Sequence, residues 1–151
     1  MNDTQHAVYS AYLRLLADQM GLRDWEITLA PEQDSDPEAA ASCSTTYGRK
    51  YATIRFGAGF FEDTPEEQRY YCVHELLHCH LYPIHLALAS AQGRLGSDAY
   101  SVLESGHHDA MEWAIDGVGV AYAKFLPLPP TPEDQELPAN VVQFPQQERT
   151  A

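Results

Sequence analysis

The amino-acid sequence predicts one α+β domain, and three observations support this prediction. Apolar residues recur at helical spacing over residues 4–20 and again over much of 65–125. Between these segments, short runs of alternating apolar and polar residues are bounded by glycine, proline and charged residues, which is typical of strands. The order is therefore a helix, a strand, a β-hairpin and then further helices. We expect a small three-stranded mixed sheet within a folded domain that covers residues 1–126.

The first helix is predicted over residues 4–20, where Asp3 or Thr4 can cap its start and Gly21 can close its end. A half-buried strand follows at residues 25–29, which alternate between apolar and polar side chains. The runs 40–47 and 51–56 predict two further strands joined in a hairpin through Gly48-Arg49-Lys50.

A second helix should begin sharply, because Thr64 and Glu67 form a capping-box pattern and Pro65 occupies the first helical position. We expect it to end at Tyr82, since the next residue is Pro83. A separate helical piece is predicted over residues 84–91.

Residues 98–125 form the last predicted helical segment, with a break near Ser105-Gly106. Its apolar residues Ile115, Val118 and Val120 indicate that much of this segment is buried. Beyond it, residues 127–151 are rich in proline and acidic residues, so we expect a tail that is disordered or loosely docked.

Charge excludes some classes of partner. The chain has 9 Lys+Arg against 22 Asp+Glu, a formal net charge of −13. Binding to phosphate backbones or anionic membrane surfaces depends on excess lysine and arginine, so we expect neither nucleic acid nor membrane as a partner. No signal-peptide pattern or long apolar run is visible, and the three cysteines Cys43, Cys72 and Cys79 form no disulfide framework. These features favour a cytoplasmic protein, expected to be monomeric.

The second helix contains the sequence His74-Glu75-Leu76-Leu77-His78. Two histidines four residues apart lie one above the other on a helix face, so their imidazoles can bind one metal ion. Zinc suits two imidazoles, and a catalytic zinc needs a third protein ligand and one open position. The carboxylate of Glu75 can reach a water on that metal and act as general base.

Glu112 is the best candidate for the third ligand of one zinc ion per chain, because it lies on a later helix with Asp116 one turn further along. Asp116 can accept the second imidazole N–H of a ligand histidine and so fix the orientation of its ring. The other candidates for the third ligand are Asp109, Asp116, His80, His85, His107 and His108.

The HELLH sequence followed by a Glu-x-x-x-Asp helix resembles the gluzincins, the thermolysin-like zinc metallopeptidases, in their minimal form. The resemblance covers residues 4–126 and implies a zincin-like fold with a backing helix, a small sheet, an active-site helix and a C-terminal glutamate helix. It implies that His74, His78 and Glu112 bind zinc, that Glu75 is the general base and that Asp116 orients a ligand histidine, His74.

The sequence therefore predicts a zinc metallopeptidase, an endopeptidase that hydrolyses peptide or protein substrates. The tetrahedral oxyanion needs a hydrogen-bond donor besides zinc, and His107, His108, Tyr82 and Tyr100 are candidates. The run 41–45, rich in small residues, is predicted to be the sheet edge that holds the peptide. The acidic composition favours cationic peptides. The alternative is a zincin-fold module that keeps zinc but acts only by binding protein.

Overall fold

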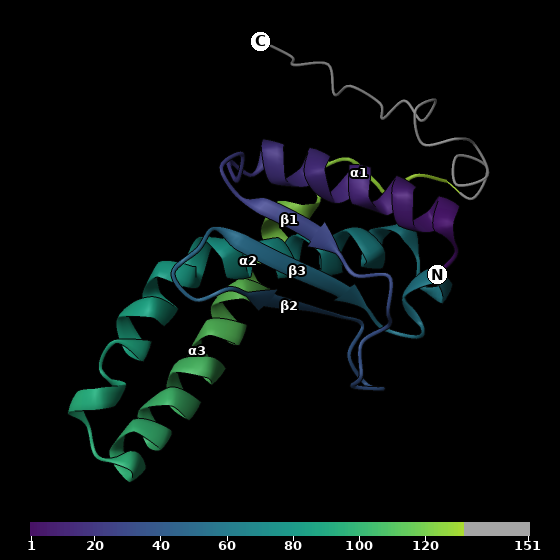
Figure 1. Ribbon diagram of the computed structural model, residues 1–151. Helices are drawn as coiled ribbons and strands as arrows, with labels where there is room; N and C mark the ends of the chain where they lie inside the picture. The colour runs from purple at the N-terminus through teal and green to yellow at the C-terminus, as the bar shows by residue number, and fades with distance from the viewer. Residues whose placement is uncertain (132–151) are drawn as a thin grey trace.

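The computed structural model describes residues 1–131 and confirms an α+β fold (Figure 1). The elements are α1 (Asp3–Gln19), β1 (Glu26–Leu29), β2 (Ala41–Thr45), β3 (Tyr51–Phe56), α2 (Pro65–Ala89) and α3 (Ser97–Ala123), with short 3₁₀ turns at Phe60–Glu62 and Gln92–Arg94. Most of the predicted tail lies outside the described residues.

The three strands form the predicted mixed sheet in the order β1-β3-β2. β1 runs parallel to the central strand β3, and β2 pairs with β3 in antiparallel register, with Cys43 opposite Ile54. The predicted hairpin is present, and Gly48 in its turn adopts a positive φ of 70°, which glycine tolerates without strain. Among the described strands, β2 lies at one edge of the sheet.

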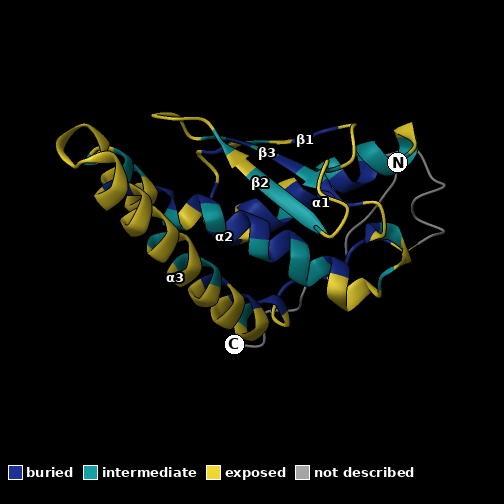
Figure 2. Ribbon diagram, turned by 90° about the horizontal axis from the view of Figure 1, so that it is seen from below, coloured by how far each residue is buried: buried dark blue, intermediate teal, exposed yellow. Residues whose placement is uncertain are grey.

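One hydrophobic core joins α1, the sheet and α2 (Figure 2). Alternate residues Ala52, Ile54 and Phe56 of β3 are buried, as their spacing predicts. α1 is capped by Asn2 through a complete capping box with Gln5, not by Asp3 or Thr4 as expected. The helix therefore begins at Asp3, whereas its apolar pattern indicates a start at residue 4.

α2 begins as predicted, with the side chain of Thr64 and that of Glu67 forming a reciprocal capping box. The prediction that it ends at Pro83 is wrong, because the helix continues to Ala89. A proline inside a helix removes one backbone hydrogen bond and usually costs about 3 kcal/mol. Tyr82 and Leu86, on either side of the proline, both pack against the core, and this packing holds the helix together across the missing bond.

α3 is continuous from Ser97 to Ala123, so the predicted break near Ser105-Gly106 is also wrong. A glycine in a helix interior costs only about 1 kcal/mol, which is too little to interrupt a long helix.

The expected burial of α3 is wrong as well. Ile115 is buried, but Val118 and Val120 are 52% and 66% exposed, and Trp113 is 81% exposed. Only a narrow face of the helix contacts the rest of the described chain, and Figure 2 shows most of the helix as exposed.

The start of the predicted tail, at Pro127, and the residue before it both bond to the rest of the domain. The hydroxyl of Tyr12 donates a hydrogen bond of 2.8 Å to the carbonyl of Pro127, and Arg69 donates one of 3.1 Å to the carbonyl of Leu126.

All three cysteines are free thiols, and Cys72 and Cys79 are buried. Within residues 1–131, no helix has the length and apolar character needed to cross a bilayer.

Candidate metal centre

The two histidines of the HExxH sequence lie one turn apart on the face of α2 that meets α3. Their ring centroids are 5.2 Å apart, and the side chains of His74 and His78 are 15% and 20% exposed. The helical rise explains this geometry, because residues four positions apart share a face. Both rings therefore reach the same space between the two helices while remaining accessible from solvent.

Glu112 enters this space from α3. Its Oε2 lies 3.2 Å from Nε2 of His74, and its Oε1 lies 3.7 Å from Nε2 of His78. One potential ligand atom from each of His74, His78 and Glu112 lies within 4.8 Å of the others, so this group could hold a metal ion. The packing of α3 against α2 thus unites residues that are distant in the sequence.

The donor set fits zinc. Two imidazoles and one carboxylate are the ligands of a catalytic zinc with one position left open. The two nitrogens of His74 are already divided between two partners, since Nε2 faces Glu112 and Nδ1 lies 3.2 Å from Oδ1 of Asp116. A metal-ligating histidine usually has this arrangement, in which the second nitrogen donates to a carboxylate.

Glu75 lies beside the three ligands but is not part of the group. It is only 6% exposed, and its Oε2 lies 3.9 Å from Nε2 of His78. Burial, followed by the nearby carboxylates of Glu112 and Asp34, raises the pKa of Glu75 to about 8. A buried carboxyl group with a pKa near neutrality can both accept and donate a proton.

Burial has the opposite effect on His78, whose pKa it lowers because the charged imidazolium is disfavoured away from water. The neighbouring His74 and His108 also lower this pKa, while Glu112 opposes them. A neutral imidazole is the form that binds a metal, so this environment suits a ligand.

Tyr70 is a residue of the site that sequence reasoning missed. Its hydroxyl donates a hydrogen bond of 2.8 Å to Oδ1 of Asp116, the same oxygen that faces Nδ1 of His74. Burial and this hydrogen bond raise the pKa of Tyr70 to about 12, so its hydroxyl remains a donor. The signal was available, because Tyr70 precedes His74 by four positions and therefore shares its helix face.

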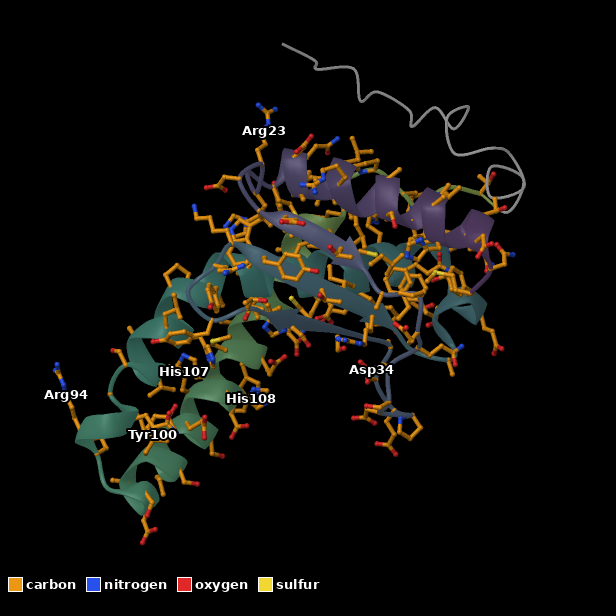
Figure 3. All side chains as sticks on the ribbon, viewed as in Figure 1. Arg23, Asp34, Arg94, Tyr100, His107 and His108 are labelled. Carbon is orange, nitrogen blue, oxygen red and sulfur yellow. The ribbon has the colours of Figure 1, made fainter. Side chains whose placement is uncertain are left out.

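His107 and His108 occupy adjacent positions on α3 and have different neighbours (Figure 3). Nδ1 of His108 lies 3.7 Å from Oε1 of Glu112, and its side chain is 70% exposed. The ring of His107 lies 6.0 Å from that of His85 on α2, and its Nε2 is buried without a hydrogen-bond partner among the described residues.

The remaining candidates lie elsewhere. The hydroxyl of Tyr82 donates to the carbonyl of Thr46 at 2.6 Å and accepts from the N–H of Gly48 at 2.8 Å, so it supports the hairpin. Tyr100 lies toward the end of α3 that is remote from the sheet (Figure 3). The residues Asp109, His80 and His85 are not part of the His74–His78–Glu112 group.

The edge strand β2 lies near this site, because α2 packs against β2. The carbonyl of Ala40 accepts from the N–H of Gly57, and the N–H of Thr46 donates to the carbonyl of Tyr51. In this antiparallel register, the even-numbered residues bond to β3. The backbone groups of Ala41, Cys43 and Thr45 therefore point to the outer edge.

The chain matches no protein-family model, no curated protein and no solved structure. What supports a possible metal site is therefore the spacing of the two histidines and the His-His-Glu geometry of the two helices.

Proposed function

We propose that this protein is a zinc-dependent peptidase whose metal is held by His74, His78 and Glu112. The observation that supports this most strongly is the position of Glu75, buried beside the three-residue group that could hold the metal. A site that served only to bind a metal would not need a buried carboxyl group there. Such a group is costly unless it has a partner or a role.

Zinc bound by these residues would lower the pKa of a coordinated water to near 7 and polarise the carbonyl of the scissile bond. Glu75, buried beside His78, would act as the base that accepts a proton and later delivers it to the leaving amine. Asp116 keeps His74 oriented with Nε2 toward the ligand group.

His108 and His107 are proposed donors to the developing oxyanion. His108 is the better placed of the two, because its ring reaches the carboxylate of Glu112 and is otherwise exposed to solvent. His107 lies beside His85 of α2. One such donor in a water-excluded site typically contributes about 10²–10³-fold to the rate, so we expect a smaller contribution from His108, which is 70% exposed.

The outer edge of β2 is the proposed docking site for the substrate. A peptide in extended conformation can pair with the outward backbone groups of Ala41, Cys43 and Thr45, as in β-strand addition. At the end of this strand, Asp34 accepts a hydrogen bond from the hydroxyl of Ser42, and its charge acts on Glu75. The acidic surroundings favour peptides with lysine or arginine, and this preference should weaken as salt concentration rises.

A second candidate function is a zinc-holding module that binds protein without hydrolysis. The exposed apolar side chains of α3, with Trp113 the most exposed, favour it, because such residues are typical of protein contacts. The two functions differ in whether Glu75 is needed for turnover.

The deciding experiment compares the zinc-loaded wild-type protein with the Glu75→Gln variant on a library of peptides that includes lysine- and arginine-rich members. We expect cleavage by the wild type and a loss of about 10²–10⁴-fold in the variant, which is the usual contribution of a general base. Glu66→Gln, an exposed change in the first turn of the same helix, is the matched control. Equal cleavage by wild type and Glu75→Gln would exclude the assigned mechanism, and no cleavage by either would favour the binding module.

A further inference from the structure

We propose that Tyr70 is a positioning residue of the metal centre, which holds Asp116 and through it His74, and that Gly119 provides the space that the Tyr70 ring requires. This inference rests on the proposed metal site, but not on the proposed peptidase activity. It assigns a role to two residues that lie outside the His-Glu-x-x-His and Glu-x-x-x-Asp patterns.

The first support is a continuous chain of contacts. The hydroxyl of Tyr70 donates to Oδ1 of Asp116 at 2.8 Å, and the same oxygen lies 3.2 Å from Nδ1 of His74. A carboxylate with one partner can rotate about its side-chain bonds, whereas two partners on one oxygen restrict it. Asp116 needs this restriction, because its side chain is 55% exposed.

The second support is the position of the Tyr70 ring. It lies edge-on to the imidazole of His74, with ring centroids 6.0 Å apart and an interplanar angle of 65°. Tyr70 and His74 share one face of α2, so the ring also limits how far the imidazole can swing along the helix. Tyr70 therefore acts on His74 both directly and through Asp116.

The third support comes from α3. A Cβ atom built on Gly119 would lie 3.2 Å from Cε2 of Tyr70, which is tighter than an ordinary contact. Gly117, only two residues earlier, has nothing within 4 Å of the same position. A side chain at residue 119 would displace the Tyr70 ring by a few tenths of an ångström, and with it the hydroxyl that reaches Asp116.

The test measures the affinity of the full-length protein for Zn²⁺ by competition with a chromophoric chelator. Loss of a direct partner of a ligand histidine usually weakens metal binding by 10–100-fold. The hydroxyl of Tyr70 bonds to Asp116 and not to the ligand histidine itself. We therefore expect Tyr70→Phe to weaken zinc binding by a smaller factor, about 3–10-fold. Gly119→Ala should weaken it by a smaller factor, and the absorption spectrum of bound Co²⁺ should change in both variants.

Matched controls separate this role from a general effect on folding. Tyr71→Phe removes the neighbouring hydroxyl, and Gly117→Ala adds a methyl group where the space is open. Both should bind Zn²⁺ as the wild type does. In an Asp116→Ala background, Tyr70→Phe should have no further effect, because the carboxylate that transmits its action is gone.

Each outcome bears on a different claim. If the wild type binds Zn²⁺ and Tyr70→Phe binds it equally tightly, the role of Tyr70 is overturned while the metal site stands. Additive losses in the Tyr70→Phe/Asp116→Ala double variant would also overturn it, because they would show that Tyr70 acts independently of Asp116. If the wild type binds neither Zn²⁺ nor Co²⁺, the metal site itself is wrong.

Discussion

Oε2 of Glu112 lies 3.2 Å from Nε2 of His74, although the two residues come from different helices. This proximity depends on how α3 packs against α2, where Gly119 approaches Tyr70 and Leu77 closely. The third ligand is therefore positioned by a helix–helix contact rather than by local sequence. A shift of α3 relative to α2 would separate the ligands without changing the structure of either helix.

The first prediction concerns the identity of the third ligand. Glu112→Ala should reduce zinc affinity by at least about 100-fold, because two imidazoles alone leave the metal with an incomplete set of protein ligands. Asp109→Ala, a change on the exposed surface of the same helix, should leave zinc affinity unchanged. Zinc content after dialysis, measured by atomic absorption, checks both variants. If Asp109→Ala loses zinc and Glu112→Ala retains it, the third ligand has been misassigned.

Local sequence patterns were sufficient to predict much of the site. The HExxH spacing placed His74 and His78 on one face of α2, and the Glu-x-x-x-Asp spacing placed Glu112 and Asp116 on one face of α3. These predictions depend only on the helical repeat. The three strands and the hairpin followed from equally local alternation and turn residues.

Features that depend on tertiary packing were predicted less well. Pro83 was expected to end α2, but core contacts of Tyr82 and Leu86 maintain the helix through it. Val118 and Val120 were expected to be buried, yet α3 makes contact along one narrow face. An apolar side chain in a sequence does not reveal whether another element covers it.

A second prediction concerns the stability of the metal-free protein. In the folded chain the pKa of Glu75 is raised from its usual 4.5 to about 8, so the folded state binds this proton more tightly than the unfolded state. The stabilising contribution is therefore fully present below about pH 4.5 and is lost as the pH rises through 8. Each pKa unit corresponds to about 1.4 kcal/mol, so we expect a loss on the order of 3–4 kcal/mol between pH 5 and pH 8.

Urea denaturation in the presence of a chelator, at pH values from 5 to 8, measures this effect. The comparison with Glu75→Gln is essential, because the lowered pKa of His78 contributes in the opposite direction at acidic pH. The unfolding free energy of the wild type minus that of Glu75→Gln should fall as the pH rises from 5 to 8. A constant difference across this range would show that Glu75 does not titrate abnormally.

A third prediction contrasts two glycines of α3. Gly117→Ala should stabilise the protein by about 0.5–1 kcal/mol, because alanine favours a helix and its methyl group meets open space. Gly119→Ala should gain less or lose stability, because its Cβ would press on the ring of Tyr70 at 3.2 Å. The free energies of unfolding from urea titrations provide the measurement. Equal stabilisation by both changes would mean that the contact between α2 and α3 is looser than described.

A final prediction tests the proposed substrate edge of β2. Thr45→Pro removes a backbone N–H that points outward, and the strand should tolerate this because its bonds to β3 come from the even-numbered residues. If a peptide pairs with this edge, the variant should lose one intermolecular hydrogen bond, which raises KM by about 3–10-fold. Thr45→Ala retains the N–H and should behave as the wild type. Zinc affinity should be the same in all three proteins, since residue 45 contributes no ligand. An unchanged KM in Thr45→Pro would show that the substrate does not pair with this edge of β2.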